Sequence, residues 1–209
     1  MGTRISNHRP TNHSYNSDIS GGSLMVRESR VIAGLLLSGA NEEEWVQVIQ
    51  VENRLQKRSP ATARRNAQAI RKRLELVGSE FWRAVRDGDE ELATQAAFCA
   101  ALERNLLLVE FMERVVGDAY SSHAEKLERF RWAEFLEDCT HRDPNIQEWK
   151  ETTKDKMGQV VFRMLAEMGY LKNTRGLQLQ HVMIRPEIKT MLLDNYKQRI
   201  KACMEVSQR

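Results

Sequence analysis

The stretch SPATARRNAQAIRKRLELV, residues 59–77, decides how this part of the chain folds and which surface it exposes. Ser59 can cap a helix, and Pro60 suits its first position, where the missing backbone N–H costs nothing. The apolar positions 63, 67, 70, 74 and 77 fall within about an 80° arc of a helical wheel. The pattern predicts a helix over residues 60–77 that buries this stripe.

The other side of this helix is basic. Residues 53–74 contain eight Lys and Arg and no Asp or Glu. Arg64 and Arg71 lie on one flank of the exposed side, and Arg65 and Lys72 lie on the other. Ordinary solvated faces mix both signs, whereas an unmixed row suits the phosphates of a nucleic acid. The expected contact residues of this block are Arg54, Lys57, Arg58, Arg64, Arg65, Arg71, Lys72 and Arg73.

The flanking segments predict further helices. Asn41 and Glu44 have the spacing of a capping box and open a helix over residues 42–54, which forms a helix-turn-helix-like pair with the basic helix. Residues 1–23 have almost nothing apolar and are expected to be a flexible arm. Other helices are expected at residues 27–38, 79–86, 89–116, 131–139 and 146–168, and after Pro186.

The pattern changes after Gly169, where residues 170–172 and 177–184 suggest two strands joined by a turn. A hairpin after three helices is the order of a winged helix. We therefore expect a mainly α protein with a flexible arm (1–23), a helical domain (24–128) and a winged-helix-like domain (129–209). A weaker second basic contact is expected on the last domain, at Lys154, Lys156, Arg163, Lys172 and Arg175.

Composition limits the class of protein. The 209 residues are 41% apolar and 29% charged, and no run has the roughly 18 uncharged apolar residues that cross a bilayer. Three distant cysteines indicate a reducing cytoplasm without disulfides. The net charge of +3 divides into +5 over residues 1–78, −7 over 79–150 and +5 over 151–209. Two basic ends favour a polyanionic partner; a monomer is the simplest expectation.

Signals for catalysis are weak. His141-Arg142-Asp143 has the letters of a kinase catalytic loop, but Pro144 follows at once and the chain has no glycine-rich phosphate loop. Cys139 and His141 have no second Cys/His pair at metal-ligand spacing. We expect no catalytic residue, no metal and no cofactor.

Several segments together resemble the BrxA family of the BREX bacteriophage-exclusion systems. They are residues 29–37, the pair Glu44-Trp45, residues 55–65 (LQKRSPATARR) and residues 157–163 (MGQVVFR) leading to 169–171, and the resemblance covers nearly everything after residue 24. It implies a small helical cytosolic protein that binds double-stranded DNA and works with other BREX proteins, among them a methyltransferase and a phosphatase-like protein. Similarity to the RNA-binding factor NusB is also implied for the helical part.

The leading expectation is a non-enzymatic, sequence-tolerant binder of double-stranded DNA. Two alternatives stay open at this point. The basic helix can instead meet an acidic surface in a protein-interaction scaffold, or it can bind RNA in the manner of NusB. None of the three involves a membrane.

Overall fold

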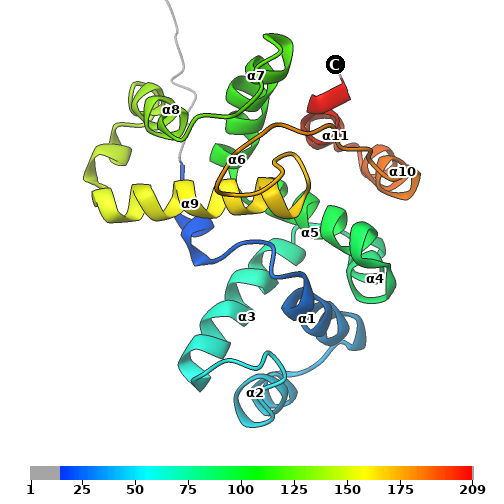
Figure 1. Cartoon of the computed structure of the whole chain (residues 1–209). Helices are drawn as coiled ribbons and strands as arrows, with labels where there is room; N and C mark the ends of the chain where they lie inside the picture. The colour runs from blue at the N-terminus through cyan, green and yellow to red at the C-terminus, as the bar shows by residue number, and fades with distance from the viewer. Residues whose placement is uncertain (1–14, 209) are drawn as a thin grey trace, which may run out of the picture.

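The computed structural model describes residues 15–208, and this part of the chain is mainly helical, with longer non-helical segments at residues 122–129 and 168–185 (Figure 1). The α-helices are α1 (Val26–Ser38), α2 (Glu42–Val46), α3 (Pro60–Leu74), α4 (Ser79–Asp87), α5 (Glu90–Arg104), α6 (Leu106–Glu110), α7 (Gly117–Ser121), α8 (Phe130–Thr140), α9 (Glu151–Glu167), α10 (Pro186–Asp194) and α11 (Gln198–Met204). Helices α2 and α6 continue as π-helical turns, Gln47–Val51 and Phe111–Val116. Short 3-10 helices occupy Asp18–Gly21, Pro144–Glu148 and Val206–Gln208.

The caps of the first helices are those expected from the sequence. The Asn41 side chain accepts from the N–H of Glu44 at 3.0 Å, and the Glu44 carboxylate accepts from the N–H of Asn41 at 2.8 Å. Ser59 caps α3 by accepting from the N–H of Thr62 at 3.3 Å, with Pro60 at the first helical position. These local bonds satisfy N–H groups that a helix start leaves unpaired, so the starts of α2 and α3 could be predicted, whereas both helices end earlier than expected.

A single long helix over residues 89–116 is not formed. Helix α5 ends at Arg104, and the axis bends by 108° before the segment Leu106–Ser121. Asn105 has an extended backbone, and its side chain accepts from the N–H of Leu108 at 3.1 Å, so it caps α6. An Asn side chain competes with the helical backbone for such donors, which is why the break falls there.

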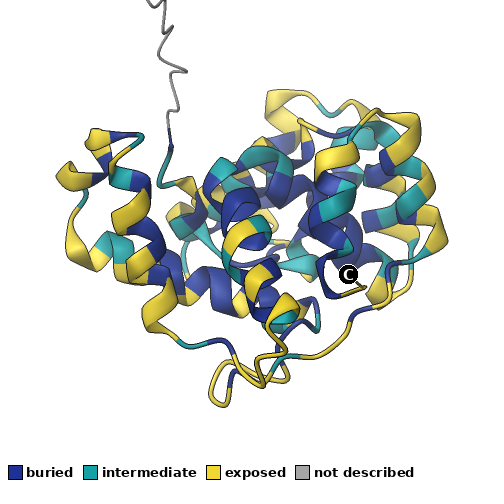
Figure 2. Ribbon diagram, turned by 90° about the horizontal axis from the view of Figure 1, so that it is seen from above, coloured by how far each residue is buried: buried dark blue, intermediate teal, exposed yellow. Residues whose placement is uncertain are grey.

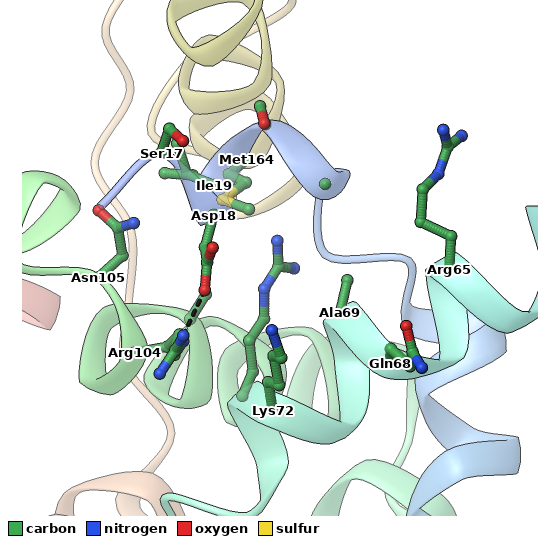
Figure 3. A pocket seen from close by; sticks show the side chains of 14 residues that line it. Ser17, Asp18, Ile19, Arg65, Gln68, Ala69, Lys72, Arg104, Asn105 and Met164 are labelled. Carbon is green, nitrogen blue, oxygen red and sulfur yellow. Dashed lines mark hydrogen bonds and ion pairs between the residues drawn. The ribbon is translucent and has the colours of Figure 1, made fainter. Parts of the chain in front are cut away.

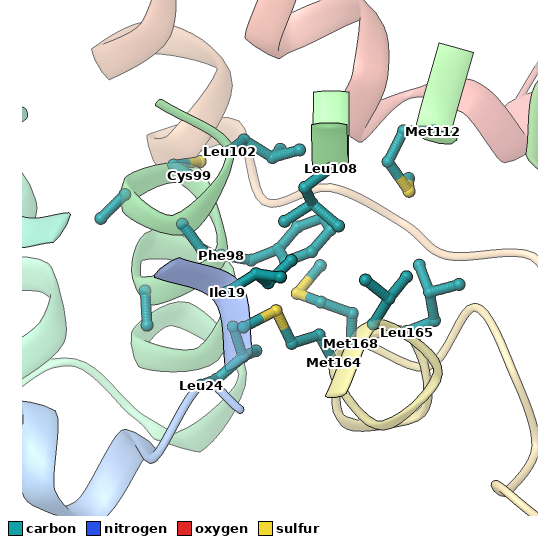
Figure 4. Packing of buried hydrophobic residues seen from close by; sticks show 14 of the residues in the cluster. Ile19, Leu24, Phe98, Cys99, Leu102, Leu108, Met112, Met164, Leu165 and Met168 are labelled. Carbon is teal, nitrogen blue, oxygen red and sulfur yellow. The ribbon is translucent and has the colours of Figure 1, made fainter. Parts of the chain in front are cut away.

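The core is one continuous cluster that runs through the whole described chain (Figure 2). Helix α5 lies at its centre, with residues 93–102 buried on all sides. Figure 4 shows Phe98 of α5 packed among Leu108, Met164 and Met168, with Ile19 of the N-terminal segment inserted between the helices. Each fully buried side chain of this size contributes about 1.5–3 kcal/mol to the stability of the fold.

Residues 15–23 do not behave as the flexible arm that the sequence suggested. Tyr15 is buried; its N–H donates to Asp143 at 2.9 Å and its hydroxyl donates to Glu110 at 3.0 Å. Ile19 is also buried in the core. The expectation failed because two apolar side chains, buried against distant parts of the chain, are enough to hold this short segment in place. Residues 1–14 of the arm lie outside the described residues.

The expected winged-helix hairpin is not formed in the described part of the chain. Within residues 15–208, Leu171 and Leu179 form only an isolated antiparallel bridge, and no strand develops around it. The following residues pair elsewhere: the N–H of Val182 donates to the Ser207 hydroxyl at 3.0 Å, and the Gln208 side chain donates to the Val182 carbonyl at 2.9 Å. Residues 170–172 and 178–180 still share two backbone hydrogen bonds, from the N–H of Lys172 to Gln178 and from the N–H of Gln180 to Tyr170, each at 2.9 Å; from Val182 onward the chain bonds the C-terminal segment instead. The boundary drawn between residues 128 and 129 stays a prediction.

No single helix among the described residues has both the length and the apolar composition needed to cross a membrane.

Candidate nucleic-acid interface

Packing of α3 determines which of its cations reach solvent. Ala63, Ala67, Ile70 and Leu74 face the core, as the periodicity predicted. Arg64, Arg65 and Lys72 lie on the opposite side and are exposed, as is Arg58 just before the helix. None of these four forms an ion pair with any residue of the described range 15–208. We call Arg58, Arg64, Arg65 and Lys72 the α3 strip.

Two other cations of the basic block are engaged within the protein. Arg71 forms ion pairs with Glu75 at 2.7 Å and Glu42 at 3.1 Å, and its guanidinium lies 4.5 Å from the ring centre of Trp45. Hydrogen bonds to these carboxylates, that to Glu75 first, raise the pKa of Arg71. Arg71 therefore joins α3 to α2. Lys57 is similarly paired with Glu28 of α1.

Arg73 is the clearest departure from the expected contact set. Arg73 is buried, with only 7% of the residue's surface exposed. The two terminal nitrogens donate to the carbonyls of Ser23 and Gly22, each at 2.6 Å. Burial lowers the pKa of Arg73 to about 10, which reflects the cost of placing a charge among neutral acceptors. Arg73 thus holds the N-terminal segment on α3 and is not positioned to touch DNA.

Arg54 is exposed but belongs to a different hollow, which it lines with Arg30 and Arg86. Arg30 donates to the carbonyls of Val85, Arg86 and Gly88 at 2.8–3.2 Å and so caps the end of α4. Arg54 itself has no such partner in the described chain. It remains available to a ligand.

Four of the five cations expected in the second basic contact are exposed. Lys156 and Arg163 are exposed on α9, and Lys172 and Arg175 are exposed at the loop that lies over α9 in Figure 1. Lys154 is half-buried and paired with Glu151 at 2.7 Å. The remaining four cations have no ion pair within residues 15–208.

Arg129 organises this second group, although no local sequence pattern indicates it. Its guanidinium donates to the Thr174 carbonyl and lies 5.8 Å from the Phe162 ring centre. The loop tip is thereby tied to α9. A lone Arg in an acid-rich block carries no local signal, so only the fold could reveal its role.

A second residue missed by sequence reasoning is Arg104. It ends α5 in the acidic middle block, yet it lines the same cleft as Arg65 and Lys72 of α3. Asp18 is its only ion-pair partner in the described chain. The fold therefore adds a cation to the α3 surface from a distant part of the sequence.

The His141-Arg142-Asp143 triplet has a structural role. Asp143 is buried and accepts from the N–H of Tyr15 and from the N–H of Asn145 at 3.1 Å. Arg142 pairs with Glu110 at 2.5 Å and donates to the Tyr15 hydroxyl at 2.9 Å. Arg142 and Asp143 therefore anchor the N-terminal segment to α6 and to the turn that follows α8.

Fold and surface together define a small helical protein with an exposed, unpaired basic strip. Residues 13–196 match the family model BrxA, and the chain belongs to the BrxA family.

The chain is 42% identical to "BREX protein BrxA" of Paramagnetospirillum magneticum over 92% of this chain and 97% of the relative. It is 36% identical to the protein of the same description in Escherichia coli O9:H4, over 84% and 82%. A crystallised protein from Magnetospirillum magneticum has 40% identity and a TM-score of 0.86 over 92% of this chain and 99% of that one.

Proposed function

We propose that this chain is a non-enzymatic component of a BREX phage-defence system that binds double-stranded DNA through its phosphate backbone. The membership of the BrxA family supports the first part of this proposal. The observation that carries the second part is the α3 strip, in which four exposed cations lack acidic partners in the described chain.

Phosphates are the ligand class that fits this strip. Arg64, Arg65 and Lys72 belong to a helix whose core stripe fixes their direction, so their charges are held on its exposed side without a binding cost for ordering the backbone. Such groups neutralise phosphates and release counterions whatever the base sequence. Binding is therefore expected to be tolerant of sequence and sensitive to salt.

The second basic group gives the duplex a further surface. Arg129 ties the loop at Thr174 to α9, which keeps Lys172 and Arg175 near the helix that presents Lys156 and Arg163. A rigid surface contributes more to binding than a mobile one because less side-chain and loop entropy is lost. We assign this surface a secondary contact with DNA.

The test is fluorescence anisotropy with a labelled duplex and the double variant Arg64→Glu/Arg65→Glu. Its binding is expected to fall below detection while the helical circular-dichroism spectrum stays unchanged. The matched control is Arg114→Glu/Arg131→Glu, which changes the charge equally at exposed arginines that already pair with Asp138 and Asp118. Its binding is expected to change much less. Equal loss in both double variants would contradict a defined site.

Two experiments separate the alternatives, a competition between RNA and duplex DNA and a pull-down of BREX partners. An RNA binder prefers an RNA hairpin to duplex DNA when the two compete. A protein scaffold retains its BREX partners in a nuclease-treated pull-down and loses them only when the strip is reversed. We expect duplex DNA to win the competition.

A further inference from the structure

A basic cleft lies between the N-terminal segment, α3 and α5, on one flank of the α3 strip. Its volume is about 240 Å³, and Figure 3 shows the side chains that line it. Among the described residues that line it, four are cations and one is a carboxylate. These charged residues are Arg65, Lys72, Arg73, Arg104 and Asp18. A cleft with this imbalance favours an anionic occupant.

The cations of the cleft are incompletely satisfied. Lys72 has no ion pair in the part of the chain that the structure describes. Arg104 bonds Asp18 through one terminal nitrogen, whereas its Nε is buried and meets no hydrogen-bond acceptor among residues 15–208. A buried donor without a partner costs about 1–3 kcal/mol, so such a group is expected to have a role.

Arg73 adds a fixed positive charge to the wall of the cleft. Both of its hydrogen bonds go to neutral carbonyls, so no carboxylate in direct contact balances the buried guanidinium. The carboxylates of Glu167 and Asp18 act on this charge only at a distance, and an anion in the cleft would add to them. The Asp18 carboxylate is itself an oxyanion that pairs with Arg104, as the dashed line in Figure 3 indicates.

Arg65 stands at the rim. It lies seven residues before Lys72 on α3, which corresponds to about 10 Å along the helix axis. In Figure 3 the Arg65 side chain also extends away from Lys72 and Arg104. Lys72 and Arg104 form the inner part of the cleft, with Arg65 as an outer contact for a larger anion.

We infer that this cleft is a binding site for a phosphate-class oxyanion, held by Lys72 and Arg104 against the wall formed by Arg73. The inference goes beyond the proposed function, since a small anion can bind here whether or not a duplex binds the strip. Asp18 is the internal competitor for the same cations. The phosphate can belong to a DNA strand or to a small molecule, and the two sources have different experimental signatures.

The experiment is isothermal titration calorimetry of the full chain with inorganic pyrophosphate. Loss of one charged hydrogen bond weakens binding by about tenfold or more, so Lys72→Gln is expected to lower the affinity by at least that factor. The matched control is Lys150→Gln, another exposed lysine without an ion pair in the described chain, which lies outside the cleft and outside both proposed DNA contacts. The control is expected to bind pyrophosphate as the wild type does.

A second variant keeps the test independent of folding. Asp18→Asn removes the competing charge while retaining a polar side chain, so it is expected to bind pyrophosphate several-fold more tightly. No binding by the wild type, or equal affinities of Lys72→Gln and Lys150→Gln, would overturn the inference.

Competition with a labelled duplex identifies the source of the phosphate. If the ligand is a DNA phosphate, pyrophosphate displaces the duplex and Asp18→Asn also tightens duplex binding. If it is a small molecule, pyrophosphate binds without displacing DNA. Loss of duplex binding in Arg64→Glu/Arg65→Glu is measured separately, so the cleft and the proposed function can fail independently.

Discussion

Neighbouring residues Lys72 and Arg73 should have opposite phenotypes, although both are cations of the same helix. Lys72 is exposed and lacks an ion pair in the described chain, whereas Arg73 is buried and bonded to the N-terminal segment. We predict that Arg73→Ala unfolds at a lower temperature than the wild type. Lys72→Ala should instead lose affinity for duplex DNA without losing stability.

The size of the effect follows from the contacts of Arg73. Its removal leaves the carbonyls of Ser23 and Gly22 without their donors. A stranded buried polar group costs about 1–3 kcal/mol, and relief of the buried charge offsets part of the total, which leaves a net loss of about 3 kcal/mol. For a chain of this length that corresponds to a decrease in Tm of about 6–12 °C. An exposed substitution such as Lys72→Ala changes stability by about 0.5 kcal/mol or less.

The assay is thermal unfolding followed by circular dichroism, with duplex affinity measured on the same preparations below the melting range of the weaker variant. Arg73→Ala is expected to bind DNA normally while folded. The reasoning is refuted if Arg73→Ala melts with the wild type, or if it abolishes DNA binding at full stability.

Three further variants test other parts of the fold. Gly158→Ala places a Cβ 2.6 Å from Trp132 Cδ1, so it should lower stability by about 1–3 kcal/mol in chemical denaturation. Gly34→Ala meets only Arg86 Cδ at 3.8 Å and should stabilise α1 by about 0.5–1 kcal/mol; equal effects of the two would contradict the packing described. The N–H of Leu92 and then Arg185 lower the pKa of Asp89, so its stabilising contribution is complete above the unfolded pKa of about 3.9 and disappears as pH falls through the folded value. The Tm of Asp89→Asn should therefore fall less than the Tm of the wild type between pH 5 and about pH 2. Parallel plots of Tm against pH for the two proteins would contradict a stabilising role of the Asp89 carboxylate.

Local features could be predicted from the sequence because their partners are close along the chain. The bonds of Asn41 with Glu44 and of Ser59 with Thr62 join residues three apart. The core stripe of α3 follows from spacing alone. The exposure of Arg64 and Arg65 follows from the same periodicity.

Features that depend on distant partners could not be predicted. Arg73 lies about 40° from the edge of the core stripe on a helical wheel, which marks it as a flanking residue, but nothing local reveals that residues 22 and 23 will cover it. The local pattern places Val182 in a strand, but its N–H donates to the Ser207 hydroxyl, which is 25 residues away. Arg104 reaches the cleft because α5 packs against α3, far from it in the sequence.

The most direct test of the DNA-binding proposal is the salt dependence of duplex affinity. Arg54 and the four residues of the α3 strip can neutralise about five phosphates, so the slope of log K against log salt should be about −4.5. Contacts by Lys156, Arg163, Lys172 and Arg175 would steepen it toward about −8. In Arg64→Gln/Arg65→Gln the slope should become shallower by about 1.8. A flat slope in the wild type, or an unchanged slope in this double variant, would contradict a phosphate contact made by the exposed cations of α3.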